Sequence, residues 1–172
     1  MKMLTTQMSG LLQRIAGREE EMIGMTARLL AQATAGEGRV FIAAFGELGA
    51  VSANALLGQE PLGGAVHYNG EEIDGTDRVW ILTRSASDQE ALQLARRLSE
   101  EFIPFAALAD EPEDAVGNEL ASLATAYVSL GVKRGLLPSD DGGRTVFPHA
   151  LAALFVYEAV RMDYEELLAE FG

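Results

Sequence analysis

Residues 40–57 read VFIAAFGELGAVSANALL, and residues 79–102 read VWILTRSASDQEALQLARRLSEEF. Both stretches begin with an unbroken apolar run, pass through a loop of small residues and end in a helical pattern. An apolar run without alternation predicts a strand buried on both faces, which is typical of a parallel sheet. A helix that follows such a strand through a tight turn directs backbone N–H groups and its positive dipole end at the space above the turn. The two stretches therefore predict an α/β protein with two neighbouring anion-binding loops.

The composition is that of a globular protein with a sizeable core. The chain has 172 residues, of which 48% are hydrophobic, and this length fits one domain at 1–172. It contains no cysteine, which excludes disulfides, thiolate catalysis and cysteine-based metal sites. Residues 1–7 lack the apolar core of a signal peptide, and no stretch approaches the ~18 apolar residues of a membrane span, so we expect a cytoplasmic protein.

The formal net charge of −13 narrows the choice of partner. Such a field repels nucleic acid and anionic lipid, so we expect neither nucleic acid nor membrane as a partner. The same field repels a phosphorylated ligand. N–H groups, hydroxyls or an arginine at the binding site must therefore attract the phosphate strongly enough to offset this repulsion. The two histidines show no metal-ligand spacing, and we expect no metal and no cofactor.

Strand and helix patterns alternate along the chain. Residues 1–35 predict a pair of helices separated at Gly17, and residues 39–172 predict an α/β core with C-terminal helices. Within that core, strands are expected at 39–45, 65–68, 77–83, 104–109 and 124–130, and helices at 51–59, 89–102, 148–162 and from 163 onward. This order implies a parallel sheet with helices on both faces, in which ligands bind at the carboxyl ends of the strands where the strand order reverses.

The two loops differ in what they indicate. The first, from Gly46 to Gly49, lacks the third glycine of a dinucleotide fingerprint, which argues against a nicotinamide enzyme. The second places the hydroxyls of Thr83, Ser85 and Ser87 at a strand end, where they can donate to phosphate oxygens. A second interpretation stays open, because Ser87 with Glu90 three residues later forms a capping box that needs no ligand.

The order of these parts resembles the sugar isomerase (SIS) domain of phosphosugar isomerases and sugar-phosphate-binding regulators, most closely the phosphoheptose isomerases and a small uncharacterised bacterial branch near them. The family's second loop reads Ser-x-Ser-Gly-x-Thr followed by Glu, and residues 83–88 with Glu90 occupy that frame. Three positions differ from the family pattern. Ala86 stands where the family has Gly, and Ala50 stands where it has Ser. Asp88 stands where the family has a Thr that donates a hydrogen bond to the phosphate. The resemblance implies a three-layer α/β/α sandwich with a flavodoxin-like parallel sheet. It also implies a set of phosphate-binding residues, namely Gly46, Gly49, Thr83, Arg84, Ser85, Ser87 and Asp88.

The resemblance further implies a chemistry and an assembly. Phosphoheptose isomerases carry a Glu at the end of the helix after the first loop and a His near the start of the C-terminal helix, and Glu60 and His149 stand at those places. As an acid/base pair they would serve an aldose–ketose isomerisation of a sugar phosphate. SIS domains bind ligand near a subunit interface, so a homodimer or homotetramer is expected. The altered loops favour two alternatives to the enzyme, which are a non-catalytic sugar-phosphate sensor and a degenerate oligomeric scaffold.

Overall fold

The computed structural model describes residues 1–112 and 114–171. Its centre is a five-stranded, entirely parallel sheet in the order β2-β1-β3-β4-β5. The strands are β1 (Val40–Ala44), β2 (Ala65–His67), β3 (Arg78–Ser85), β4 (Phe105–Asp110) and β5 (Ala126–Ser129). This strand order is the flavodoxin-like one, whose reversal point lies between β1 and β3. The predicted α/β sandwich and its parallel sheet are confirmed.

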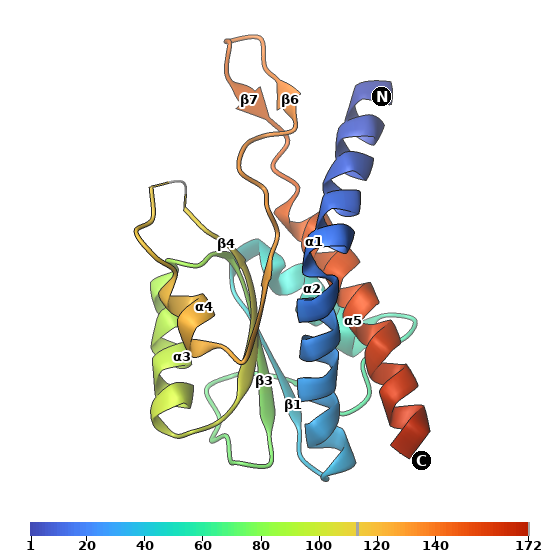
Figure 1. Cartoon of the computed structure of the whole chain (residues 1–172), viewed down its shortest axis with the longest axis vertical. Helices are drawn as coiled ribbons and strands as arrows, with labels where there is room; N and C mark the ends of the chain where they lie inside the picture. Colours follow the sequence, from blue (N-terminus) through green and yellow to red (C-terminus); the bar gives the residue numbers. More distant parts are fainter. Residues whose placement is uncertain (113, 172) are drawn as a thin grey trace.

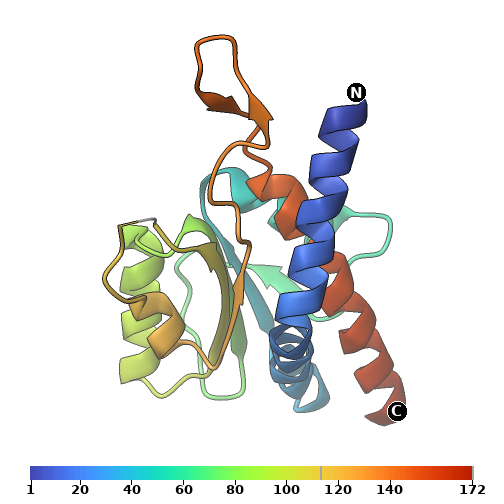
Figure 2. The same ribbon diagram turned by 45° about the horizontal axis from the view of Figure 1, so that its top comes forward.

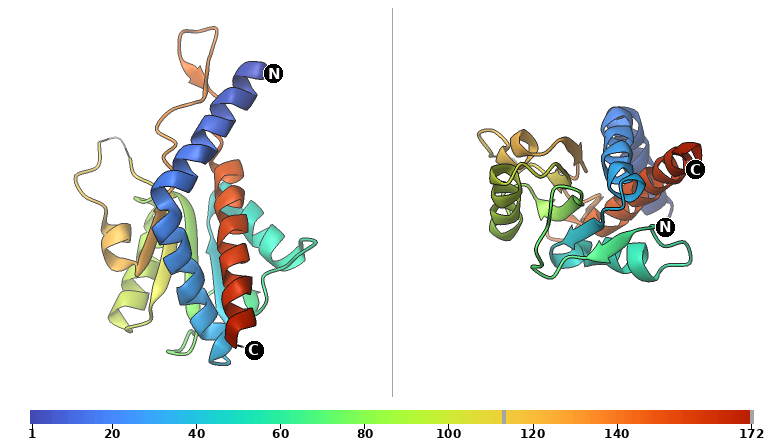
Figure 3. Two further views of the ribbon diagram at one scale, coloured as in Figure 1. Left: turned by 45° about the vertical axis from the view of Figure 1, so that its right-hand side comes forward. Right: turned by 90° about the horizontal axis from the view of Figure 1, so that it is seen from below.

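Helices cover both faces of the sheet (Figure 1). One layer holds α1 (Lys2–Ala35), α2 (Gly49–Leu57) and α5 (His149–Phe171), and the other holds α3 (Gln89–Glu100) and the short α4 (Glu119–Leu123). The view from below in Figure 3 shows α3 and α4 on one side of the strands and α1 and α5 on the other. Within residues 1–112 and 114–171, none of the helices combines the length and apolar character that crossing a membrane requires.

The alternation of side chains along the strands explains why both faces are covered. In β3, Trp80 and Leu82 point into the core under α1 and α5, whereas Val79 and Ile81 point into the core under α3. All four are fully buried. Strands that are apolar on both sides need a helix layer on each face, which the predicted pattern of unbroken apolar runs anticipated.

The N-terminal helices are one helix, not the predicted pair. Helix α1 runs through Gly17, where an added Cβ would meet nothing within 4 Å. A single glycine lowers helix stability by only about 1 kcal/mol, and the buried stripe continues on both sides of it, from Leu11 and Ile15 to Ile23 and Leu30. Packing of this stripe against the sheet and α5 outweighs that penalty.

The predicted break at residue 163 is wrong for the same reason. Helix α5 continues to Phe171 because Val156, Tyr157, Val160 and Tyr164 form one buried face across the expected cap. Two elements were missed, which are α4 and a hairpin of β6 (Leu137–Pro138) and β7 (Arg144–Thr145). The hairpin extends beyond the sheet beside the N-terminal half of α1, as Figures 1 and 2 both show.

Candidate functional site

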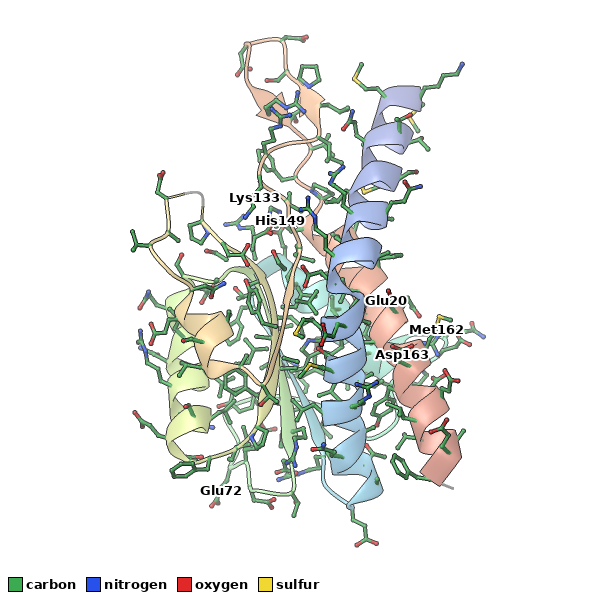
Figure 4. The ribbon with its side chains drawn as sticks, in the orientation of Figure 1. Glu20, Glu72, Lys133, His149, Met162 and Asp163 are labelled. Atoms are coloured by element: carbon green, nitrogen blue, oxygen red, sulfur yellow. The ribbon has the colours of Figure 1, made fainter. Side chains whose placement is uncertain are left out.

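A pocket of about 450 Å³ lies at the carboxyl ends of the strands. Its walls come from the loop after β1, the end of β3, the loops after β4 and β5, and the start of α5. The lining residues are Glu47, Arg84, Ser85, Asp110, Glu111, Pro112, Val132, Lys133, Phe147 and His149. Figure 4 shows Lys133 and His149 together at this end of the sheet, with Glu72 at the opposite end. The pocket occupies the position where parallel α/β sheets bind ligands.

The register of β3 and β4 brings the second loop to this pocket. Leu82 pairs with Leu108, and after an irregularity Ser85 pairs with Asp110. The N–H of Ala86 then donates to the carbonyl of Asp110 at 2.8 Å. As a result, the hydroxyl-bearing loop predicted from the sequence lies directly beside Asp110.

Asp110 and His149 form a buried pair on the pocket wall. Each is 6% exposed, and His149 Nε2 lies 3.1 Å from Asp110 Oδ2. Both carboxylate oxygens of Asp110 also accept from the N–H of Val132, each at 3.1 Å. A proton on Nε2 faces this carboxylate, and a neutral ring that carries its proton on Nε2 has Nδ1 as an acceptor. Among the described residues nothing hydrogen-bonds to this buried Nδ1.

The two cations of the pocket are each held by a carboxylate. Arg84 Nη1 lies 3.5 Å from Glu47 Oε1, which joins the end of β3 to the turn after β1 across the reversal point. Lys133 Nζ lies 3.2 Å from Glu111 Oε2, which also accepts from the Ser129 hydroxyl at 2.9 Å. Burial raises the pKa of Glu111, but hydrogen bonds from its own backbone, Ser129 and Lys133 outweigh burial and lower it overall. Glu111 is therefore ionised at neutral pH, and an anionic ligand competes with it for Lys133.

Hydrogen bonds within the second loop occupy most of its donors. Thr83 is 1% exposed and its hydroxyl donates to Asp88 Oδ2 at 3.2 Å. Ser85 Oγ and Ser87 Oγ lie 2.8 Å apart and are partly accessible. Asp88 is the N-cap of α3, since its Oδ1 accepts from the N–H groups of Glu90 and Ala91 at 3.0 and 3.1 Å. The predicted cap at Ser87 is thus displaced by one residue, because a carboxylate is the stronger partner for a helix N-terminus.

The first loop adopts the tight turn that its glycines allow. Gly46 has a φ of +58°, which favours glycine, and it opens a 3₁₀ turn over Gly46–Leu48. Gly49 begins α2 with ordinary helical angles. This turn directs the side chain of Glu47 toward Arg84.

Glu60 lies away from this pocket within one chain. Its Oε2 pairs with Arg161 Nη2 at 2.9 Å, and its side chain is 69% exposed. Arg161 is on α5, twelve residues after His149, which corresponds to roughly 18 Å of helix. Met162, the next residue, is labelled in Figure 4 well below His149. A single subunit therefore does not bring Glu60 and His149 to one substrate, and their pairing stays a prediction that requires a second subunit.

Sequence reasoning missed four residues that define this pocket, namely Glu47, Asp110, Glu111 and Lys133. A signal existed for Asp110, because it ends the third predicted strand and carboxyl ends of strands are where ligands bind. Lys133 follows β5 in a segment without a strong pattern. Within residues 1–112 and 114–171, no group of three or more His, Asp or Glu side chains is arranged to hold a metal ion.

Comparison with known proteins places the chain within a family and a fold. Residues 1–168 match the family described as a domain of unknown function, DUF2529. The Bacillus subtilis (strain 168) protein named "Uncharacterized protein YwjG" is 30% identical over 174 residues, which cover 100% of this chain and 99% of that protein.

Several solved structures share the fold at low sequence identity. A hypothetical protein of Methanococcus jannaschii, whose structure was taken to infer a 3-hexulose-6-phosphate isomerase function, superposes with a TM-score of 0.68 at 14% identity, covering 97% of this chain and 90% of that one. The Vibrio vulnificus NanR protein complexed with ManNAc-6P superposes with a TM-score of 0.69 at 17% identity, covering 97% of this chain and 62% of that one. Phosphoheptose isomerase GmhA of Neisseria gonorrhoeae gives 0.65 at 10% identity, covering 94% of each chain. The chain therefore has the SIS fold and belongs to the DUF2529 family.

Proposed function

We propose that this protein binds a phosphorylated sugar in the pocket at the carboxyl ends of its strands. The observation that carries the proposal is the convergence of two cations, Arg84 and Lys133, with the accessible hydroxyl of Ser85 and the Asp110–His149 pair in one 450 Å³ hollow. Cations and hydroxyls recognise phosphate oxygens, and carboxylates and an imidazole recognise sugar hydroxyls. SIS neighbours in complexes with sugar phosphates support this choice of ligand.

Calorimetric titration tests this proposal. Sedoheptulose 7-phosphate and ManNAc-6P are the probes, each with its unphosphorylated sugar as a control. Arg84→Gln is expected to weaken binding of the phosphorylated probes about tenfold, as for loss of one charge-assisted hydrogen bond. Arg28→Gln is the matched control, because Arg28 is an exposed arginine of α1 that does not line this pocket. Absence of binding at millimolar concentration by every sugar phosphate tested would contradict the proposal.

The finer proposal is an aldose–ketose isomerase of the phosphoheptose type, with Glu60 and His149 as the acid/base pair. Asp110 Oδ2 lies 3.1 Å from His149 Nε2, and a neutral His149 ring with its proton on Nε2 presents Nδ1 as the acceptor that a general base requires. In this conformation Nδ1 is buried, so turnover requires the residues that cover it to move. His149→Ala is expected to abolish isomerisation of sedoheptulose 7-phosphate while the protein stays folded.

A non-catalytic sensor is the second candidate, and the second loop favours it. Asp88 places a carboxylate where a phosphate would use the N–H groups of α3, and both pocket cations already hold carboxylates. Such a site binds weakly and responds to concentration without turning over its ligand. The sensor is supported over the isomerase if a sugar phosphate binds saturably and is still chemically unchanged after prolonged incubation with the protein.

A further inference from the structure

A second cavity adjoins the first and is lined by a concentration of positively charged side chains. It measures about 320 Å³ and sits between α1, the segment after β5 and the β6–β7 hairpin. Five of its eleven lining residues are cations, out of 13 in the whole chain, and none of the eleven is acidic. Those cations are Arg14, Arg18, Lys133, Arg134 and Arg144. In a chain of net charge −13, this concentration marks a local field of opposite sign.

Three of these arginines have no acidic partner. Within residues 1–112 and 114–171, Arg14, Arg18 and Arg134 form no ion pair, and all three are exposed. Glu19, on the same helix, lines a small adjoining recess with Arg14 and Arg18 and interacts electrostatically with Arg18, but its carboxylate accepts a hydrogen bond from the Ser129 N–H. Three guanidinium groups that line one cavity without an ion pair repel each other, and an anion between them relieves that repulsion.

Arg144 is held in place by hydrogen bonds, which gives the cavity a defined wall. Arg144 donates from Nε to the Gly135 carbonyl and from Nη2 to the Leu136 carbonyl, both at 2.9 Å. Gly135 allows this close approach, because a Cβ there would lie 2.5 Å from the Thr145 carbonyl oxygen. The hairpin is thereby fastened to the wall of the cavity, and Arg144 holds one face of it while α1 supplies the other.

We infer that this cavity is a second anion-binding site, which takes a small ligand bearing a diphosphate group. Arginine forks bind phosphate oxygens in pairs, and three unpaired arginines exceed what one phosphate group would neutralise. The apolar side chains of Leu11, Val132 and Leu136 contribute to the wall, and the volume lies at the lower end of small-molecule pockets. Two sources share this chemistry, namely inorganic pyrophosphate and the diphosphate of a nucleotide.

The new site adjoins the sugar-phosphate pocket, because Val132 and Lys133 line both cavities. Lys133 pairs with Glu111 on the side of the first pocket. An anion in the second cavity attracts the Lys133 ammonium and weakens its hold on Glu111. Occupation of the second site is therefore expected to alter affinity at the first, which makes it a candidate effector site.

Isothermal titration of the full chain with inorganic pyrophosphate, ADP and inorganic phosphate tests this inference at constant ionic strength. Pyrophosphate is expected to bind at least about tenfold more tightly than phosphate, since it engages more arginines. Tighter binding of ADP than of pyrophosphate would identify a nucleotide as the ligand, and the reverse order would identify the inorganic anion. Either order supports the site, whereas absence of pyrophosphate and ADP binding at millimolar concentration overturns it.

Single substitutions locate the binding. Arg14→Gln, Arg18→Gln and Arg134→Gln are each expected to weaken pyrophosphate binding about tenfold. Arg28→Gln removes the same charge from an exposed position on the same helix that does not line this cavity, and it is expected to have no such effect. An equal loss with Arg28→Gln would mean a diffuse electrostatic effect and would overturn the site. A larger loss with Arg84→Gln than with Arg14→Gln would place the anion in the first pocket and would also overturn it.

Discussion

At the residue scale, two buried aspartates show one chemistry used for two purposes. Asp77 lies just before β3 and Asp110 ends β4, so they stand at opposite ends of the sheet. Asp77 accepts from several N–H groups and Asp110 from the N–H of Val132, and such donors make a buried charge less costly. Asp77 holds Arg39 and fastens the amino-terminal edge, whereas Asp110 holds His149 at the pocket.

The ionisation of Asp77 predicts a pH dependence of stability. Burial raises the pKa of Asp77, but hydrogen bonds from the Arg39 side chain and from the N–H groups of Asp74 and Arg39 outweigh burial and lower it below its ordinary 3.8. A lowered folded-state pKa gives stability that is complete above pH 3.8 and is lost as the pH falls through the folded value. Asp77→Asn is expected to cost about 1–3 kcal/mol at pH 7.

Urea denaturation of wild type and Asp77→Asn at pH 7, 4 and 3 measures this effect. The difference in unfolding free energy between the two proteins is expected to shrink as the pH falls, because the wild type loses its advantage when Asp77 is protonated. Asp141→Asn serves as the comparison, since that carboxyl also has a lowered pKa but lies on an exposed turn. A difference that stays constant from pH 7 to pH 3 would show that Asp77 is not the titrating group.

At the element scale, the start of α3 combines a helix cap with the proposed anion site. Asp88 caps the helix by accepting from the N–H groups of Glu90 and Ala91, which a bound phosphate would otherwise use. Asp88→Thr retains a capping hydroxyl and removes the negative charge, so phosphate binding is expected to tighten by about 1–3 kcal/mol with little change in stability. Asp88→Ala removes both roles and is expected to cost about 1 kcal/mol of unfolding free energy.

Titration with one sugar phosphate, together with the melting temperature, separates the two roles of Asp88. Unchanged affinity in Asp88→Thr combined with lower stability would show that this residue is a cap alone.

Two glycines in different elements are expected to respond in opposite directions to alanine. Gly17 lies inside α1 with open space around its Cα, so Gly17→Ala should stabilise the protein by about 0.5–1 kcal/mol. Gly38 precedes β1, and a Cβ there would lie 2.1 Å from the Thr76 carbonyl oxygen, so Gly38→Ala should cost about 1–3 kcal/mol. Chemical denaturation measures both. Destabilisation by Gly17→Ala would contradict the continuous helix.

The elements also show what the sequence can predict. Apolar runs identified β1, β3 and β4, because strands buried on both faces are mostly apolar. Local signals failed where packing over a long distance outweighed them, as at Gly17 in α1 and residue 163 in α5. The sequence located both loops but did not predict the side-chain contacts between them. Arg84 pairs with Glu47, which lies 37 positions earlier in the chain, and no local pattern reports such a contact.

At the scale of the whole molecule, charge and apolar surface are unevenly distributed. The cations of the two cavities together lie at one end of the molecule, beyond the carboxyl ends of the strands. The chain as a whole is strongly acidic. This arrangement draws anionic ligands toward that end and repels them elsewhere. The left view in Figure 3 shows α1 and α5 side by side along the opposite layer from α3.

The outer side of α5 and α2 has the character of an interface. Leu151 and Met162 are 58% and 65% exposed, and their spacing of eleven residues, about three turns, puts them on one face of α5. Leu57 of α2 is 85% exposed, and Asn54 of the same helix hydrogen-bonds to Glu158 of α5. Arg161 and Glu60 belong to this region. A second subunit packed here would bury the apolar side chains and bring Glu60 into an interface.

Subunit complementation tests whether one active site takes Glu60 and His149 from different chains. If it does, Glu60→Gln and His149→Ala are each inactive, yet mixed oligomers contain some sites with both wild-type residues. Co-refolding the two variants at equal concentration is then expected to restore about a quarter of wild-type isomerisation in a dimer, because half of the dimers are mixed and each carries one intact site. Refolded single variants are the controls. A mixture as inactive as its parents, despite native mass spectrometry showing mixed oligomers, would remove the shared site. Glu60 would then be a surface partner of Arg161. Removing the Glu60 carboxylate would lower the free energy of unfolding by less than about 1 kcal/mol, because this carboxylate is solvated.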